Sequence, residues 1–436
     1  DRLCPGLRQV QHHPLRQAEA GSDVYSELFR IAGSEAHDHD AEDHVYEGEH
    51  GGRKTMKKAL LVTHVSGFVP QFEMGNVKIL QEMGYEVHYA SNYHNPSYGD
   101  DNHRLDGTGI IRHQVDFERS PYSLKNLTAY RQLKKLMEEE RFDLVHCHTP
   151  MGGALARLAA RKTKTGPVIY TAHGFHFFKG APLINWLVYY PVERWLSRFT
   201  DVQVTINHED YMRAKNQFKA RRTVRIHGVG IDLAPSGKSR EEKRWELGIQ
   251  PDEILLLTAG ELNRNKNQRM VLEAMGKLKG MTETKLVYAA CGKGDCLESL
   301  EKRARELGIE ANVRFLGYRE DFREILKAAD IFLMPSYREG LPTVVMEAMS
   351  AGLPVIGTDI RGNRDLIQPG TTGYLVGVDD AGQMAQAIKR LAEDENLRRE
   401  MGAGGQTAIL PFGREQVAKE MKKIYCSLEG QTWKDK

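Results

Sequence analysis

Short runs of consecutive apolar residues alternate with longer amphipathic stretches along most of this chain. The run at 331–334 ends at Pro335, and the stretch after it begins at Thr343 and ends at Gly352. A continuous apolar run indicates a strand buried on both faces, whereas apolar residues three and four positions apart indicate a helix. Their alternation is typical of α/β domains with a parallel sheet.

Two such series follow one another, and we expect each to form a doubly wound, Rossmann-like domain. The first series predicts strands at 59–63, 86–90, 110–114, 143–147, 168–171, 202–205 and 224–226, and helices at 70–83, 123–140, 151–162, 183–198 and 208–217. The second predicts strands at 254–258, 286–290, 313–316, 331–334 and from 355, and helices at 267–278, 296–307, 321–327, from 343 and at 414–428.

The domain boundaries are placed where this pattern breaks. Residues 1–55 are polar and lack apolar periodicity, so we expect a disordered or non-native extension there, and its histidines among acidic residues do not by themselves indicate a metal site. The remaining divisions are an N-terminal domain at 56–232, a linker at 233–252, a C-terminal domain at 253–410, and a last helix at 411–436.

Charge and cysteine content narrow the class of protein. The 436 residues carry a formal net charge of +2, which does not point to nucleic acid as a partner. The five cysteines are irregularly spaced and fit free thiols in a reducing compartment better than disulfides. No apolar stretch reaches the length of a membrane span, and no signal peptide is evident, so we expect a cytoplasmic protein.

The stretch 336–363 holds two glutamates in positions that suit a ligand. Glu339 falls in the loop that follows a predicted strand, and Glu347 lies two turns into the next helix. Ligands of open α/β sheets bind at this edge, Gly340 allows close approach, and free amides at a helix start favour an anion. These features fit a nucleotide sugar, although two solvated glutamates would be the ordinary interpretation of the pair alone.

The residues around this pair resemble a known family. Arg-Glu-Gly-Leu-Pro before Glu-Ala-Met-Ser-Ala-Gly-Leu-Pro-Val-Ile closely resembles the signature of retaining GT-B glycosyltransferases of family 4. The resemblance covers residues 56 to 427 and implies two Rossmann-like domains facing across a cleft that holds the active site. It also implies that the domain at 56–232 is on the acceptor side, that the domain at 253–410 binds the nucleotide sugar, and that the helix at 411–436 crosses back to the N-terminal domain. The segment from Thr171 to Phe175, with Asn185, Trp186 and 189–191, is similar to bacterial capsular and exopolysaccharide members.

The resemblance also implies roles for individual residues. Lys266 and the amides of Gly340 and Leu341 would hold the donor diphosphate, Glu339 and His173 would position the transferred sugar, and Glu347 would accept the ribose hydroxyls. Glu261 replaces the family's arginine, and Arg264 is the candidate to stand in for it. The other predicted nucleotide contacts are Gly292 and the backbone around Tyr318 and Arg319.

Two features of the N-terminal half have more than one interpretation. Ser66 and Gly67 follow the first strand without a full dinucleotide fingerprint, so they form either a close approach to a ligand or a plain tight turn. His146 and His148 share one face of a predicted strand, as metal ligands would, but no third ligand is evident and structural histidines are favoured.

The segment 177–198 combines aromatic residues with Lys179, Arg194 and Arg198. Interfacial helices have this composition, which makes contact with a membrane surface or a lipid-linked acceptor one hypothesis. A core helix kinked at Pro191 is the other.

We therefore expect a retaining glycosyltransferase that moves a hexose or N-acetylhexosamine from a UDP-sugar to a saccharide or lipid-linked saccharide in cell-surface polysaccharide synthesis. No cofactor or metal is expected, because the cationic residues would neutralise the diphosphate, and the protein would be cytoplasmic with peripheral membrane contact. Two alternatives stay open: a nucleotide-sugar 2-epimerase, which acts without an acceptor, and a non-catalytic nucleotide-sugar-binding protein.

Overall fold

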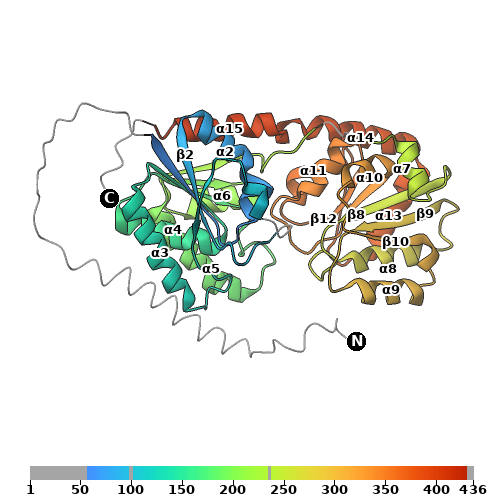
Figure 1. Ribbon diagram of the computed structural model, residues 1–436. Helices are drawn as coiled ribbons and strands as arrows, with labels where there is room; N and C mark the ends of the chain where they lie inside the picture. Colours follow the sequence, from blue (N-terminus) through green and yellow to red (C-terminus); the bar gives the residue numbers. More distant parts are fainter. Residues whose placement is uncertain (1–55, 98–101, 234–236, 430–436) are drawn as a thin grey trace, which may run out of the picture. The chain divides into compact units, whose positions relative to one another are not determined.

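The computed structural model describes residues 56–97, 102–233 and 237–429, and these form two parallel α/β units (Figure 1). The first unit contains the described residues up to Ile206, Asp210–Ile226, and those from Ala418 onward. The second contains Asn207–Glu209 and the described part of His227–Val417. The predicted extension at 1–55 lies outside the described residues.

The first unit has a seven-stranded sheet in which every pair of neighbours is parallel. Its strand order is β3-β2-β1-β4-β5-β6-β7. The strands are β1 Lys57–Val62, β2 Tyr85–Ser91, β3 Ile111–Gln114, β4 Leu144–His148, β5 Val168–Ala172, β6 Val202–Thr205 and β7 Arg222–Arg225.

Helices cover both faces of this sheet. Leu60 and Val62 of β1 belong to the core beneath α3 and α4, whereas His146 of β4 faces the other way and contacts Tyr425 of α15. In Figure 1, α3 and α4 lie together on the opposite face from α2 and α15. The helices are η2 Val69–Glu73, α2 Met74–Glu82, η3 Asn102–Leu105, α3 Lys125–Glu140, α4 Pro150–Thr163, α5 Leu183–Leu196, η4 Ser197–Phe199, α6 His208–Gln217 and α15 Arg414–Cys426.

The second unit has a six-stranded parallel sheet in the order β10-β9-β8-β11-β12-β13. The strands are β8 Glu253–Ala259, β9 Lys285–Cys291, β10 Val313–Gly317, β11 Ile331–Met334, β12 Val355–Thr358 and β13 Gly373–Val376. The helices are α7 Arg240–Glu246, α8 Gln268–Leu278, α9 Leu297–Glu306, η5 Glu310–Asn312, α10 Phe322–Ala328, α11 Thr343–Ser350, α12 Asn363–Leu366, α13 Ala381–Glu393, α14 Glu395–Ala408 and η6 Leu410–Phe412.

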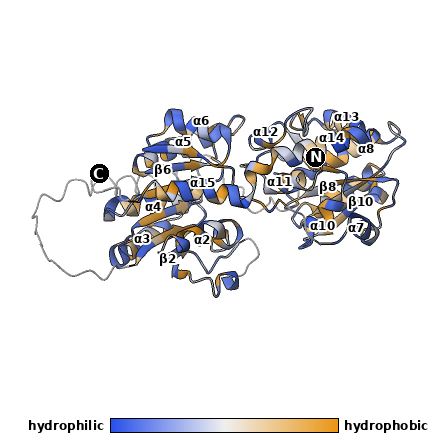
Figure 2. Ribbon diagram, turned by 90° about the horizontal axis from the view of Figure 1, so that it is seen from above, coloured by the Kyte–Doolittle hydropathy of each residue, from blue (hydrophilic) through white to orange (hydrophobic). Residues whose placement is uncertain are grey.

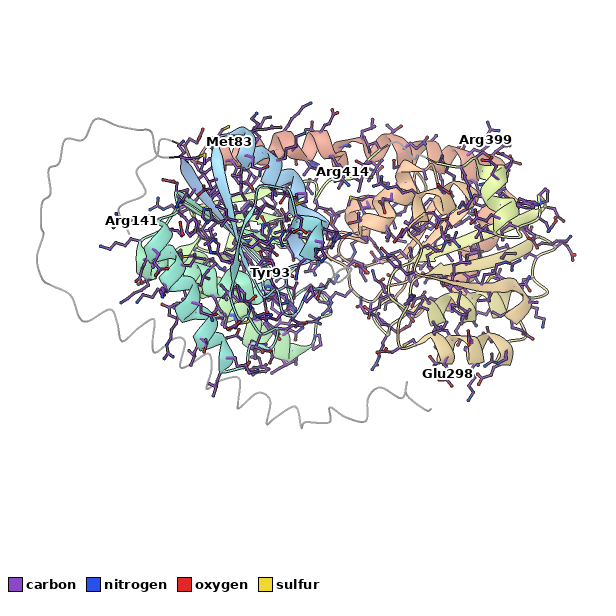
Figure 3. The ribbon with its side chains drawn as sticks, in the orientation of Figure 1. Met83, Tyr93, Arg141, Glu298, Arg399 and Arg414 are labelled. Carbon is purple, nitrogen blue, oxygen red and sulfur yellow. The ribbon has the colours of Figure 1, made fainter. Side chains whose placement is uncertain are left out.

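The expected fold class is confirmed, because both units are doubly wound parallel sheets with helices on both faces. Figure 2 shows hydrophobic residues concentrated on the strands and on helix surfaces next to them, with hydrophilic ribbon outside. Long polar side chains project outward at element ends: α3 stops at Glu140, and Arg141, with a left-handed φ of 52°, extends into solvent (Figure 3).

Helix α7 lies inside the segment that the sequence analysis assigned to a linker. A capping box starts it: the Ser239 hydroxyl accepts from the Glu242 amide, and the Glu242 carboxylate accepts from the Ser239 amide. Lys243 is buried and contacts Asp321 and Glu324. The polar residues of this segment, which predicted a linker, instead form a helix that is held in place by charged contacts.

Helix α11 begins without a side-chain cap. Thr343 is the first helical residue, and Pro342 is the N-cap, without a side-chain hydrogen bond. The Pro342 carbonyl accepts from the amides of Val345 and Met346 and starts the helix instead. The other predicted ranges each match an element within a few residues, and the predicted helix at 70–83 divides into the π-helical turn η2 and α2. The elements α12, β13, α13 and α14 lie in a stretch for which no element was predicted.

Each sheet has one point where the strand order reverses. It lies between β1 and β4 in the first unit and between β8 and β11 in the second. The loops after these strands leave the same edge of the sheet in opposite directions, which opens a crevice where α/β proteins bind ligands.

Among the helices of the described chain, none combines the length and apolar character needed to cross a membrane.

Candidate active site

The reversal point of the second unit brings together the loops after β8 and β11. Lys266 comes from the β8 loop and Glu339 from the β11 loop, 73 residues further along. The Lys266 Nζ donates to the Glu339 Oε1 at 2.8 Å, and the two side chains are 21% and 13% exposed. The structure therefore joins two residues that the sequence analysis had assigned separate roles.

Glycine at position 260 leaves room for this lysine. Gly260 has a φ of +136°, and a Cβ built on it would lie 3.0 Å from Cε of Lys266. On the other side of the pair, Arg361 Nε donates to the carbonyl oxygen of Glu339 at 3.2 Å. Lys266 and Glu339 are thus held by their own backbone surroundings as well as by each other.

The turn between Glu339 and helix α11 presents free backbone donors. Within the described part of the chain, no residue accepts a hydrogen bond from the amides of Gly340 or Leu341. The turn is fixed from behind by Gly362, where a Cβ would lie 2.6 Å from the Gly340 carbonyl oxygen. Unpaired amides just before a helix form a site for an anion.

Glu347 lies on α11 and is mostly buried. Arg323 Nε donates to it at 3.3 Å, and Arg323 Nη1 also donates to Asp232 at 2.8 Å. Burial raises the pKa of the Glu347 carboxyl, and the Arg323 guanidinium counteracts part of that effect. Glu347 is therefore an acceptor held in place by an arginine that has a second acidic partner.

Arg264 takes a different position from Lys266. It lines a cavity of about 500 Å³ whose walls, drawn from the described residues, do not include Lys266 or Glu339. Tyr337 and Asp379 also line this cavity and hydrogen-bond each other at 2.5 Å. No contact within the described chain joins Arg264 to Lys266, so its substitution for the family arginine stays a prediction.

The other predicted nucleotide contacts lie after β9 and β10. Tyr318 is 70% exposed, whereas the Arg319 guanidinium pairs with Asp321 and with Glu246 at 2.9 Å. Gly292 has a φ of +148°, and a Cβ there would lie 1.9 Å from the Gly260 carbonyl oxygen. Close packing against Gly260 therefore requires glycine at position 292. The side chain of Arg319 is paired with acidic residues, so only the backbone of Arg319 is left to contact a ligand.

The reversal point of the first unit assembles a second group of polar side chains. Glu73 ends η2, His148 ends β4, and His173 follows β5. Glu73 Oε1 lies 3.5 Å from His148 Nδ1 and 3.5 Å from His173 Nε2, and these two nitrogens are 3.2 Å apart. Two histidines and a glutamate are residue types that can bind a metal ion. For His148, no third metal ligand is evident from the sequence, whereas the structure places Glu73 and His173 beside it.

Burial dominates the electrostatics of this trio. It raises the pKa of Glu73 to about 8, lowers the pKa of His173 to about 4, and lowers that of His148 well below its usual value. All three groups are therefore uncharged near neutral pH. Glu73 carried no motif in the sequence; its only signal was a carboxylate at the start of the first helix after the first strand.

The neighbouring N-terminal residues are engaged within the unit. His146 Nδ1 hydrogen-bonds the Tyr425 hydroxyl and its Nε2 the Thr171 hydroxyl, each at 2.8 Å. Ser66 Oγ donates to Asn102 at 2.6 Å. A Cβ on Gly67 would lie 1.6 Å from the Ser97 carbonyl oxygen, so this glycine permits close packing of two loops. A ligand role for Ser66 and Gly67 stays a prediction.

The aromatic residues of 177–198 mostly belong to the core. Phe177 is buried, and Trp186, Tyr189, Tyr190 and Trp195 pack against the core cluster. The exposed surface of α5 is aliphatic instead: Leu183, Ile184 and Leu187 are 80%, 45% and 73% exposed. These three residues, which we call the α5 aliphatic patch, replace the aromatics as the candidate membrane contact.

Comparisons with known proteins cover both units. Residues 57–207 match the family model "Glycosyl transferase 4-like", and residues 239–408 match "Glycosyl transferases group 1". The chain is 39% identical over 389 residues to EpsD of Bacillus subtilis (strain 168), named as a glycosyltransferase, which covers 87% of this chain and 99% of EpsD.

A second relative and a solved structure extend the comparison. Identity is 29% over 283 residues with the UDP-Gal:alpha-D-GlcNAc-diphosphoundecaprenol alpha-1,3-galactosyltransferase of Escherichia coli, covering 63% of this chain and 72% of that enzyme. The crystal structure of Anabaena HepE in complex with UDP and glucose aligns with a TM-score of 0.70 and 19% identity, over 86% of this chain and all of HepE. Because family models, relatives and fold agree over both parallel sheets, this chain belongs to the group 1 glycosyltransferases and is itself a glycosyltransferase of GT-B architecture.

Proposed function

We propose that this protein transfers a hexose or N-acetylhexosamine from a UDP-sugar to a saccharide or lipid-linked saccharide acceptor, with retention of the anomeric configuration, in cell-surface polysaccharide synthesis. The observation that supports it most is the Lys266–Glu339 pair, which lies beside two unpaired amides at the reversal point of the second unit.

The pair supplies the two chemical functions that donor binding requires. A diphosphate needs positive charge and directed N–H donors, which Lys266 and the amides of Gly340 and Leu341 provide. A sugar needs acceptors for its hydroxyl groups, which the Glu339 carboxylate provides. We infer that the donor separates the pair: Lys266 moves to the phosphate oxygens and keeps an anionic partner, while Glu339 accepts hydrogen bonds from the sugar hydroxyl groups.

The local groups favour retention without a covalent intermediate. A double displacement by side chains uses two carboxyl groups about 5 Å apart across the sugar, and the group in contact with Glu339 here is a lysine. In our proposal the diphosphate leaves on the face where the acceptor enters and takes the acceptor's proton, while Lys266 stabilises the developing charge. His173 would hydrogen-bond the transferred sugar, and Glu347 would accept the ribose hydroxyls.

The names of the relatives support the substrate class. The Escherichia coli relative is named for a UDP-galactose donor and an acceptor linked to diphosphoundecaprenol, and HepE binds UDP and glucose. A lipid-linked acceptor lies at a membrane surface. We therefore propose that the α5 aliphatic patch contacts that surface and places the protein, as a peripheral enzyme, beside its acceptor.

The proposal is tested by replacing each member of the pair. Lys266→Ala and Glu339→Ala should each lower turnover on the order of a hundredfold, as expected for loss of a partner of transition-state charge. The matched controls are Lys285→Ala and Asp252→Ala, which break an exposed pair with a 2.7 Å contact in the same unit and should leave turnover unchanged.

Products are followed by mass spectrometry over a panel of UDP-sugars and lipid-linked acceptors, with NMR of the donor in acceptor-free samples. Normal turnover in both site variants would refute the site assignment. Conversion of the donor sugar without acceptor would indicate the epimerase, and UDP binding with no turnover of any donor would indicate a non-catalytic protein.

A further inference from the structure

The trio of Glu73, His148 and His173 has hydrogen-bond donors and acceptors that can be assigned one atom at a time. The carboxyl group of Glu73 is the starting point. Asn76 Nδ2 donates to Glu73 Oε2 at 2.5 Å, so Oε2 acts as an acceptor. Oε1 is the oxygen that faces the two imidazoles. Because burial keeps this carboxyl protonated at neutral pH, the proton is placed on Oε1.

The second step concerns His148, which is fully buried. Its Nδ1 faces the other two groups, while its Nε2 is buried with no hydrogen-bond partner in the described part of the chain. A buried N–H without an acceptor costs more free energy than a buried lone pair without a donor. The single proton of neutral His148 therefore belongs on Nδ1, from where it points toward His173 Nε2 at 3.2 Å.

His148 then directs its proton at Nε2 of His173, and Oε1 of Glu73 lies 3.5 Å from the same nitrogen. Nε2 must accept, so the one proton of the neutral ring lies on Nδ1. Among the described residues, none hydrogen-bonds Nδ1, and the His173 side chain is 22% exposed. The edge of the Phe68 ring, with centroids 4.9 Å apart, holds the imidazole in this orientation.

We propose that Glu73 and His148 are positioning residues that hold His173 in the tautomer protonated on Nδ1, so that His173 presents an N–H donor to the ligand. This rests on the proposed function, in which the ligand is the transferred sugar. A hydroxyl group of a sugar both donates and accepts, and the fixed tautomer selects the arrangement in which the sugar oxygen accepts.

A metal ion is the main alternative for the same three residues. Two histidines and a glutamate with one open position form a known type of zinc site. However, a metal on His148 Nδ1 would move the proton to Nε2, where no described residue accepts it. Metal-binding histidines usually donate their other N–H to a carboxylate or carbonyl, and this partner is missing for His148. The geometry therefore favours the hydrogen-bonded histidine pair, with Glu73 beside it.

The test reads the tautomer directly and does not require turnover. Two-bond ¹⁵N–¹H correlation spectra of histidine-labelled protein distinguish a proton on Nδ1 from one on Nε2, with His173 assigned from the spectrum of His173→Gln. We expect the Nδ1–H form in the wild type and in Glu73→Gln, whose amide also donates, and a mixture of tautomers in Glu73→Ala and His148→Asn. Finding Nε2–H in the wild type, or one bound zinc per chain by elemental analysis, would overturn the proposal.

Turnover provides a second readout through its pH dependence. Ionised Glu73 would accept from His173 and draw the proton to Nε2, so kcat should fall as pH rises through about 8, and this alkaline limb should be absent in Glu73→Gln. Besides His148 and His173, the groups near Glu73 are Asn76 of the following helix α2, Tyr89 of β2 and Tyr425 of α15. Burial raises the pKa of both tyrosines, to about 12 for Tyr89.

Glu73→Ala should lower kcat by about tenfold to a hundredfold, the size of effect expected from a misplaced catalytic group. Glu82 on the exposed side of α2 is the matched control, and Glu82→Gln should keep both the rate and the alkaline limb. An alkaline limb that persists in Glu73→Gln would contradict the assignment. If the wild type shows the expected tautomer but transfers no sugar, the proposed function is contradicted. The assignment of the tautomer by Glu73 and His148 is then still supported.

Discussion

Individual side chains of the candidate site neutralise one another. Lys266 pairs with Glu339, and Arg323 joins Glu347 to Asp232. A mostly buried charge that has a partner avoids much of the cost of leaving water, but the partner must be exchanged when a ligand arrives. In the proposed function, the donor would take the place of these partners.

Glu347 provides a prediction on donor affinity. Glu347→Ala should weaken binding of UDP roughly tenfold to a hundredfold, the range for hydrogen bonds to a charged group, and change kcat much less. Isothermal titration with UDP measures the affinity. Glu298→Ala, at an exposed glutamate of α9 (Figure 3), is the control and should bind UDP normally. Unchanged affinity in Glu347→Ala would contradict the ribose contact.

Glu73 provides a prediction on stability. Its pKa rises from 4.5 in the unfolded chain to about 8 in the folded protein, so between these values the folded state binds the additional proton. The free energy of unfolding therefore decreases as pH rises across this window. Glu73→Gln lacks this loss, so its Tm relative to the wild type should increase from pH 5 to pH 8. A difference in Tm that is constant over this range would show that Glu73 is ionised in the folded protein.

At the scale of elements, short segments at the strand ends determine what each side chain can reach. The turn η2 places Glu73 over the ends of β4 and β5, and the Pro342 carbonyl starts α11 so that the amides of Gly340 and Leu341 stay unpaired. Helix α5 turns its aromatic residues into the core and leaves Leu183, Ile184 and Leu187 outside. The composition of 177–198 predicted an unusual helix but not which side chains would be exposed.

The α5 aliphatic patch gives the prediction at this scale. The wild type should float with anionic liposomes, and a variant carrying Leu183→Ser and Leu187→Ser should not, because burial of apolar side chains in the interface drives such binding. Leu410→Ser, at an exposed leucine outside α5, is the control and should float like the wild type. Equal flotation of the double variant and the wild type would remove α5 as the contact.

At the scale of the whole molecule, the two sheets repeat one arrangement. Each has a single reversal point, and each candidate group of side chains lies at that edge. The parallel order explains why residues far apart in the sequence meet, as Lys266 and Glu339 do. Residues within one loop can also point to different places. Arg264 lines the cavity described above, whereas Lys266, two residues later, contacts Glu339 outside the walls of that cavity.

The metal-independent scheme is tested on the intact protein. Turnover with a UDP-sugar and acceptor should be unchanged by EDTA, because Lys266 and the amides of Gly340 and Leu341 supply the charge stabilisation that a metal would otherwise provide. Rates are measured in chelator-treated buffer with and without added Mg²⁺ or Mn²⁺. A strict requirement for either ion would contradict this scheme.

The sequence by itself determined the fold class, the approximate bounds of most strands and helices, and the identity of Lys266, Glu339, Glu347 and His173 as candidates. The fold class and the bounds follow from local periodicity, whereas Lys266 and His173 follow from the resemblance of the residues around them to the family. Helix α7 was missed, because buried charged residues such as Lys243 have the same composition as a solvated linker until their partners are known.

The tertiary structure alone decided which candidates meet. The Lys266–Glu339 contact spans 73 residues, and the contact of Glu73 with His148 and His173 brings together segments after three different strands. The order of strands in a parallel sheet sets such distances, and no local pattern encodes that order. Burial, which raises the pKa of Glu73 and lowers the pKa of His173, arises in the same way from packing of the folded chain.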